Sequence, residues 1–180
     1  MKILIWTILL IFLGVASISR DIHVNTFFQK IKEKIVIKFP SDPDPEQLQC
    51  MALNIYFESA LEPREGKIAI GQVVINRVKS KSYPDTICGV VKQGIHFKNG
   101  EPVKNKCQFS WYCDGIDDEP WKGRRWFESY DIAHKLLTDY PFYNFAKDSL
   151  FYHAKYVNPW WSKHFIQVAQ IGKHIFYKIR

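Results

Sequence analysis

Three glutamates, Glu58, Glu62 and Glu65, lie close together on either side of Pro63. The residues before Glu58 predict a helix, so that Glu58 falls in its last turn among aromatic neighbours. The negative end of a helix dipole and apolar surroundings both disfavour a carboxylate, and a like charge at Glu62 would act in the same direction. Such a Glu stays protonated near neutral pH, as a general acid requires, although most glutamates at helix ends are solvated surface charges.

Aromatic side chains form a second group of candidate functional residues, because the C–H faces of sugar rings stack on aromatic rings. Aromatic residues make up 16% of the chain, and five of the six tryptophans lie at position 111 or later. Aromatic residues more often belong to a core, so only part of this group is expected in a groove. The loop aromatics that could bind sugar are Phe109, Trp111, Tyr112, Trp121, Trp160 and Trp161.

Two helices joined by a short turn must position Glu58. Asp44 suits an N-cap and Pro45 a first helical position, so the first helix is expected to begin there. Apolar residues follow a helical period to about Leu61, and Pro63 ends the helix. A second helix is expected over about residues 64–79, and the apolar residues on both of its faces predict a central place in the domain.

Shorter elements complete the domain. Residues 165–179 are rich in β-branched and aromatic residues, and Gly172 between two such runs predicts a β-hairpin. The other expected elements are a short helix capped by Asp85 and ending at Val91, a loop over 94–123, a helix over 124–138 and a short helix over 146–153.

The N-terminus has the pattern of an export signal. Lys2 precedes an apolar run over residues 3–15, and Ser17 and Ser19 suit the small-residue positions of a cleavage site. We therefore expect residues 1–19 to be a signal peptide or a signal-anchor that associates transiently with the inner membrane. Residues 20–43 alternate apolar residues with lysines and predict a basic amphipathic connector, either near a membrane or packed on the domain. The catalytic unit is then expected over residues 44–180.

The charge and cysteine content agree with a place outside the cytoplasm. Lys and Arg number 25 against 18 Asp and Glu, which favours an anionic partner. Export makes an envelope polymer or anionic lipid the expected partner and argues against nucleic acid. An even number of cysteines predicts disulfides, with three pairings open. The sequence has no C-x-x-C spacing, which a metal site would need, and we therefore expect no metal and no cofactor. The cysteines are Cys50, Cys88, Cys107 and Cys113.

Several blocks of the chain, in order, resemble the SleB/CwlJ cell wall hydrolase family. Residues 55–78 read IYFESALEPREGKIAIGQVVINRV, similar to the family block IYxEARGEPxEGxxAVxxVxxNRV. PDTICGVV, CQFSWYCDG and IGKHIFY follow at residues 84–91, 107–115 and 171–177 and are similar to later family blocks. Ser59, Ala60 and Leu61 replace the usual Ala-Arg-Gly, a departure that leaves Glu58 in place.

The resemblance implies an α+β, mainly helical, lysozyme-like fold with a small antiparallel β-hairpin. It also implies action on peptidoglycan glycan strands, between N-acetylmuramic acid and N-acetylglucosamine, with Glu58 as the catalytic acid. We expect the substrate groove to include Gln72, Phe109, Ser110, Trp111, Tyr152 and His153. Asn76 and Arg77 are expected to be structural, tying a helix to a loop.

A single Glu suffices for a lytic transglycosylase, which is the expected activity. Hydrolysis would usually need a second carboxylate, for which Glu65 and Asp114 are weak candidates. The alternatives are an N-acetylmuramoyl-L-alanine amidase and a non-catalytic peptidoglycan-binding module. We expect action in the periplasm or cell envelope; growth, germination, division and phage lysis all remain open as biological roles.

Overall fold

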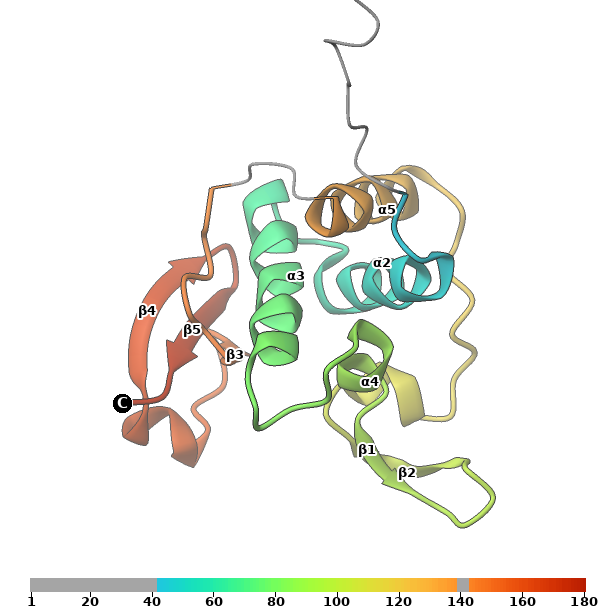
Figure 1. Ribbon diagram of the computed structural model, residues 1–180. Helices are drawn as coiled ribbons and strands as arrows, with labels where there is room; N and C mark the ends of the chain where they lie inside the picture. The colour runs from blue at the N-terminus through green and yellow to red at the C-terminus, as the bar shows by residue number, and fades with distance from the viewer. Residues whose placement is uncertain (1–41, 139–142) are drawn as a thin grey trace, which may run out of the picture. The chain divides into compact units, whose positions relative to one another are not determined.

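The computed structural model describes residues 42–138 and 143–180, within a compact unit that spans Pro40–Arg180 (Figure 1). The predicted signal over 1–19 and nearly all of the predicted connector over 20–43 lie outside the described residues. Across 42–138 and 143–180, none of the helices has both the length and the apolar character needed to span a membrane.

Four α-helices build the larger part of the unit. They are α2 (Pro45–Ser59), α3 (Arg64–Lys79), α4 (Ile87–Val91) and α5 (Arg124–Leu137). Asp44 caps α2 as predicted, since its Oδ1 accepts hydrogen bonds from the backbone N–H groups of Glu46 and Gln47. The α3 helix contacts α2, α4 and α5 and also strand β4 (Ile166–Ile171), which confirms its predicted central place (Figure 1).

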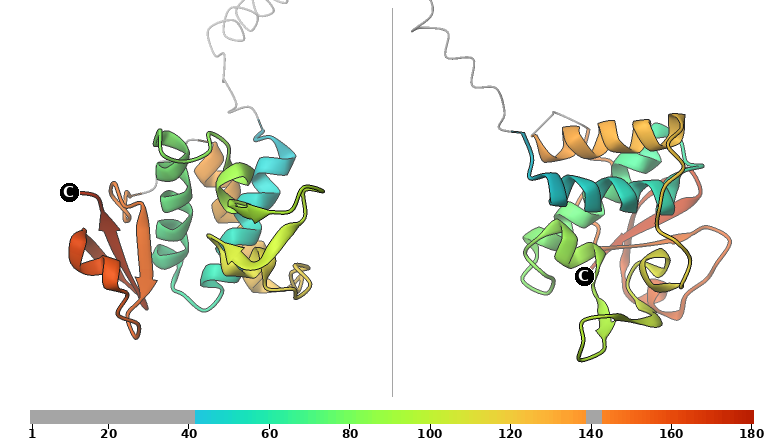
Figure 2. Two further views of the ribbon diagram at one scale, coloured as in Figure 1. Left: turned by 90° about the horizontal axis from the view of Figure 1, so that it is seen from below. Right: turned by 90° about the vertical axis from the view of Figure 1, so that its right-hand side faces the viewer.

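A three-stranded antiparallel sheet packs against α3 on the side opposite to α2 and α5 (Figure 2). Its order is β3-β5-β4, with β3 at Phe151–Ala154 and β5 at His174–Lys178. The β4–β5 pair is the predicted hairpin. The predicted helix over 146–153 is wrong: residues 151–154 are the strand β3, because the free edge of β5 supplies its hydrogen-bonding partners.

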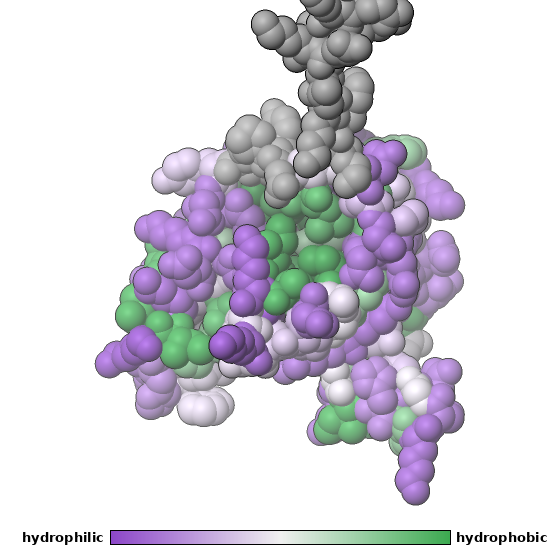
Figure 3. All heavy atoms as spheres, viewed as in Figure 1, coloured by the Kyte–Doolittle hydropathy of each residue, from purple (hydrophilic) through white to green (hydrophobic). Residues whose placement is uncertain are grey.

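The predicted loop over 94–123 also contains regular structure. Strands β1 (Gly94–His96) and β2 (Pro102–Cys107) form a hairpin that stands out from the body of the unit (Figures 1 and 3), and the 3₁₀ helix η1 (Ser110–Cys113) follows. A second 3₁₀ helix, η2 (Trp160–His164), lies between β3 and β4. The α4 helix is capped by Thr86 rather than by Asp85, since the Thr86 hydroxyl accepts from the Gly89 N–H.

Two disulfides join these parts. Cys50–Cys88 links α2 to α4, and Cys107–Cys113 links β2 to η1, so all four cysteines are paired as predicted. The main core cluster lies among α2, α3, α4, α5 and η1, and a smaller one lies between α3 and the sheet around Phe176. The predicted α+β class, mainly helical with small antiparallel β structure, is confirmed.

Candidate active site

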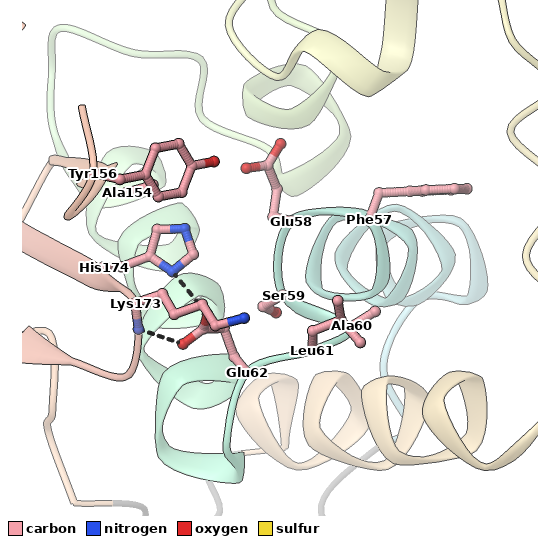
Figure 4. A pocket seen from close by; sticks show the side chains of 10 residues that line it. All are labelled: Phe57, Glu58, Ser59, Ala60, Leu61, Glu62, Ala154, Tyr156, Lys173 and His174. Carbon is pink, nitrogen blue, oxygen red and sulfur yellow. Dashed lines mark hydrogen bonds and ion pairs between the residues drawn. The ribbon is translucent and has the colours of Figure 1, made fainter.

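Glu58 lies in the last turn of α2, half-buried, and its side chain points into a pocket (Figure 4). Burial raises the pKa of this carboxyl above its ordinary value. Two neighbours oppose the shift without cancelling it: the Tyr152 hydroxyl, which donates a hydrogen bond of 3.0 Å to Oε2, and the positive charge of Arg77. The predicted rise in the pKa of Glu58 is therefore confirmed, with burial as its main cause.

Two adjoining pockets share Glu58. The larger, of about 540 Å³, lies between the end of α2, η1 and β3; the smaller, of about 350 Å³, lies towards the α2–α3 turn and the β4–β5 turn. Both are also bordered by Phe57, Ala154, Tyr156 and His174. The larger pocket is further lined by Arg77, Gln108, Phe109, Ser110, Trp111, Asp114, Tyr152, His153 and Val157. Glu58 therefore lies where the two pockets adjoin.

Trp111 forms part of the wall of the larger pocket and is held rigidly. Its indole N–H donates to Oδ1 of the fully buried Asn54 at 3.2 Å, and its ring stacks on Phe57 with a centroid distance of 4.9 Å. Asn54 and Phe57 belong to the same helix as Glu58, so α2 supports both the aromatic wall and the Glu58 carboxyl.

Arg77 reaches the site from α3 and is also tied to the chain before β3. Its Nε donates to the Leu150 carbonyl at 2.9 Å, and its guanidinium lies over the ring of Phe109 at 5.2 Å from the centroid. Asn76 donates to the carbonyls of Lys147 and Ser149. Both residues tie the helix to this segment as expected, and Arg77 in addition places a positive charge near Glu58.

Glu62 occupies a different environment from Glu58, four residues away. Its side chain is only 4% exposed and turns away from Glu58, towards the β4–β5 turn (Figure 4). Oε2 accepts the backbone N–H of Lys173 at 2.9 Å, and Oε1 lies 3.6 Å from Nδ1 of His174. Burial lowers the pKa of His174, and the charge of Glu62 acts against this effect.

Five of the six predicted groove residues meet at the larger pocket with Glu58: Phe109, Ser110, Trp111, Tyr152 and His153. Gln72 lies elsewhere on α3. Both ends of its amide bind backbone of the segment before β3, through the carbonyl of Tyr143 and the N–H of Ala146. His153 is held in turn by Tyr177, whose hydroxyl lies 3.0 Å from its Nε2.

The other loop aromatics do not border either pocket. Trp121 and Trp160 are 78% and 77% exposed, while Trp161 packs in an aromatic group with Phe151, Phe165 and Tyr177. The pocket residues that sequence reasoning did not assign to the groove include Tyr156 and His174. His174 stands in the IGKHIFY block, which was a usable signal, whereas nothing in the sequence distinguishes Tyr156 from other exposed tyrosines.

The acidic residues near the site are unequal candidates for a second carboxylate. Asp114 borders the larger pocket, where its Oδ1 accepts the N–H of Ile116 at 2.7 Å. Glu65 is exposed in the first turn of α3 and borders neither pocket. Within 42–138 and 143–180, no three His, Cys, Asp or Glu side chains are arranged to hold a metal ion.

Comparison with known proteins identifies the family. A family model described as Cell Wall Hydrolase matches residues 61–177. The chain belongs to this cell wall hydrolase family. The matched segment includes α3, η1 and the sheet, and it begins after Glu58.

Relatives of this cell wall hydrolase include two spore cortex-lytic enzymes. The enzyme of Oceanobacillus iheyensis is 29% identical over 150 residues, which cover 79% of this chain and 45% of that protein. The enzyme of Bacillus subtilis is 23% identical over 149 residues, which cover 81% of this chain and 42% of that protein. The chain thus spans less than half the length of these relatives.

Solved structures of this cell wall hydrolase family extend the similarity to the fold. The catalytic domain of the Bacillus cereus SleB protein matches with a TM-score of 0.55 and 26% identity, over 77% of this chain and 94% of that one. The catalytic domain of the germination-specific lytic transglycosylase SleB from Bacillus anthracis matches with a TM-score of 0.59 and 26% identity, over 77% and 99%. The expected family and its fold are therefore confirmed.

Proposed function

We propose that this chain cleaves peptidoglycan glycan strands between N-acetylmuramic acid and N-acetylglucosamine, as a lytic transglycosylase with Glu58 as acid and then base. The observation that carries the proposal is the environment of Glu58. Burial raises its pKa, which favours the protonated form that a general acid needs, and its side chain faces a pocket walled by aromatic residues. The name of the Bacillus anthracis relative, a lytic transglycosylase, supports the same reaction class.

The first step is proton donation. Protonated Glu58 gives its proton to the glycosidic oxygen while the bond from that oxygen to C1 of the muramic sugar breaks, and the 2-acetamido oxygen of that sugar assists by bonding to C1. The carboxylate left behind is the form that the Tyr152 hydroxyl and the Arg77 charge stabilise. Burial thus favours the acid before the step, and these two groups favour its anion afterwards.

The second step returns the proton. The Glu58 carboxylate takes the proton of the sugar's own C6 hydroxyl as O6 bonds to C1 and displaces the acetamido oxygen, which yields a 1,6-anhydro sugar and regenerates the acid. A muramidase would use water instead and leave a reducing end, usually with a second carboxylate about 5–9.5 Å away. Among the described residues, Asp114 is the one other carboxyl residue at the larger pocket.

The remaining features of the chain agree with an envelope substrate. The net charge of +7 favours an acidic polymer, and the predicted export signal over residues 1–19 would bring the enzyme to the periplasm or cell envelope, with transient attachment to the inner membrane. The relatives are named for the spore cortex, so peptidoglycan glycan strands are the proposed substrate and partner.

The test is cleavage of purified peptidoglycan by the full chain and by Glu58→Gln, with the soluble products analysed by mass spectrometry. We expect Glu58→Gln to lose at least about 10²-fold in rate, because general acid catalysis contributes about 10²–10⁴-fold. Glu65→Gln, which changes an exposed Glu of α3, is the matched control and should retain the native rate.

Native turnover by Glu58→Gln would overturn the assignment of the acid. Anhydro ends support the transglycosylase, and reducing ends would replace it with a muramidase. Free stem peptides whose release stops with a chelator would replace both with a zinc amidase. A wild-type chain that binds peptidoglycan and releases nothing would indicate a binding module.

A further inference from the structure

The buried Glu62 and the half-buried His174 form a pair beside Glu58 that the proposed mechanism does not use. They come from distant parts of the chain: Glu62 from the α2–α3 turn, and His174 from the first residue of β5. Their side chains are 4% and 13% exposed, and both border the smaller pocket together with Glu58 (Figure 4). A buried carboxylate next to a half-buried imidazole therefore lies at the edge of the site.

The position of Glu62 is tightly determined. Its Oε2 accepts the Lys173 N–H, and two glycines leave room for its carboxylate. A Cβ at Gly66 would lie 3.2 Å from Oε2, and a Cβ at Gly172 would overlap Oε2 outright. Gly172 also has a φ of +57°, which favours glycine. The turn therefore packs closely around this carboxylate, and the Lys173 N–H helps to hold it there.

The charge of the carboxylate favours one of the two neutral forms of His174, although no hydrogen bond joins the two side chains. Oε1 of Glu62 faces Nδ1 at 3.6 Å, and a negative charge at this position favours a proton on Nδ1 in the neutral ring. Nε2 is then the unprotonated nitrogen and acts as a hydrogen-bond acceptor. In Figure 4 this second nitrogen points into the pocket, towards the space between Tyr156 and Glu58. The Tyr152 ring packs edge-on against the imidazole at 5.4 Å and limits its rotation.

From this geometry we infer that His174 is a second catalytic residue, which accepts a hydrogen bond from the N–H of the substrate's 2-acetamido group, and that Glu62 is its positioning residue. The inference rests on the proposed function, in which the acetamido oxygen bonds to C1 as the glycosidic bond breaks. That step puts positive charge on the acetamido group, and an acceptor at its N–H stabilises this charge. No proton is transferred to His174, and Glu58 keeps both of its roles.

The charge state of His174 supports this role. Burial lowers its pKa, Glu62 raises it, and His153 and Lys173 lower it further. These groups come from β3, the α2–α3 turn and the β4–β5 turn; Glu58 of α2 and the phenol of Tyr152 also face the same space. The ring is therefore neutral above a pKa that lies below its ordinary value of 6.5, so that Nε2 is free to accept at neutral pH. Protonation at acid pH would convert it to a donor and abolish the interaction.

The test compares two substrates and three variants of the full chain. The substrates are purified peptidoglycan and the same material after enzymatic removal of its N-acetyl groups. On N-acetylated material, His174→Gln should lose about 10²-fold in turnover and Glu62→Gln about 10-fold, by analogy with lost oxyanion donors and lost orienting partners. His134→Gln, a partly exposed His of α5 outside both pockets, is the matched control and should keep the native rate.

Removal of the N-acetyl groups separates a catalytic role from a structural one. The wild-type rate should fall on the deacetylated substrate, and His174→Gln should then cause little further loss, because the group that it serves is gone. Equal losses by His174→Gln on both substrates would overturn the inference. So would native turnover on N-acetylated material in either the His174→Gln or the Glu62→Gln variant.

The pH profile provides an independent readout. Turnover of the wild type should fall at acid pH as His174 is protonated. Glu62→Gln removes the charge that raises the pKa of His174, so its acid limb should move to lower pH, while His174→Gln should lose this limb. An unchanged acid limb in both variants would contradict the inference. Glu58→Gln is assayed in parallel: its activity would refute the proposed function itself, whereas an inactive Glu58→Gln with unaffected His174 and Glu62 variants would refute only this inference.

Discussion

The last turn of α2 and the turn that follows it hold two glutamates in opposite situations. Glu58 is half-buried and faces a pocket, where burial disfavours its charge more strongly than Tyr152 and Arg77 favour it. Glu62 is the more deeply buried of the two, yet a backbone N–H and His174 face its oxygens. Burial by itself therefore does not mark the acid. At Glu58, burial outweighs the stabilisation of the charge and favours the protonated form, whereas Glu62 acts as an anchor because its Oε2 accepts the Lys173 N–H.

The largest effect on stability is expected on the anchoring side, from Gly172→Ala. The new Cβ would overlap the Glu62 carboxylate and would also force Ala into a φ of +57°, so we expect a loss of about 3 kcal/mol or more in the free energy of unfolding. Gly100→Ala is the matched control, because its φ is +90° and nothing lies within 4 Å of its added Cβ. It should lose only about 1–2 kcal/mol, the contribution of the backbone alone. Equal losses in the free energy of unfolding of the two variants, measured with denaturant, would show that the contact with Glu62 does not contribute to the loss.

A smaller effect of opposite sign is expected from Glu58→Gln. Because the folded-state pKa of Glu58 is raised, the contribution of this carboxyl to stability is fully present below its unfolded pKa and is lost as pH rises through the folded pKa. Gln carries no such penalty. The variant should match the wild type in thermal unfolding well below the ordinary value of 4.5 and should have the higher melting temperature at mildly alkaline pH. A variant that is less stable than the wild type at every pH would mean that Glu58 serves the fold, as Glu62 does.

The smallest effect is expected from Tyr152→Phe, which tests how the Tyr152 hydroxyl affects the pKa of Glu58. Loss of the hydroxyl removes a hydrogen bond that lowers the pKa of Glu58, so the alkaline limb of the activity profile should move to higher pH. Turnover should fall by about 10-fold, since the carboxylate formed in the first step loses a partner. Tyr143→Phe, at an exposed tyrosine, should change neither quantity. A limb that moves to lower pH would reverse the assigned sign of the hydrogen bond.

Prediction from sequence succeeded where the signal was local. Asp44 and Pro45 begin α2, Pro63 separates it from α3, and each acts through the backbone of its own neighbourhood. It failed for residues 151–154, where the short segment was predicted as a helix. That segment becomes a strand because β5, more than 20 residues later, offers a free edge. Local preference over four residues is too weak to compete with such a ladder of hydrogen bonds.

The residues of the site also divide into those predicted correctly from sequence and those that were not. Phe109, Ser110 and Trp111 were predicted and do border the pocket, because they follow directly on a disulfide-bonded strand that carries them there. Gln72 was predicted with them, but the side of α3 on which it lies binds the segment before β3. The elements that pack on each side of a central helix decide which of its faces borders a pocket. Both faces of α3 are apolar, so the sequence did not show which one would be covered.

The sequence by itself determined that Glu58 stands at a helix end, which helices carry it, and that four cysteines are able to pair. Only the tertiary structure decided which cysteines join, which residues surround each glutamate, and that Glu58 borders both pockets with a raised pKa whereas Glu62 borders the smaller pocket and accepts the Lys173 N–H. The physical reason is distance along the chain. Tyr152 lies 94 residues from Glu58 and Lys173 lies 111 residues from Glu62, so the burial and hydrogen bonds that separate the two carboxyls arise only when the sheet packs against the helices.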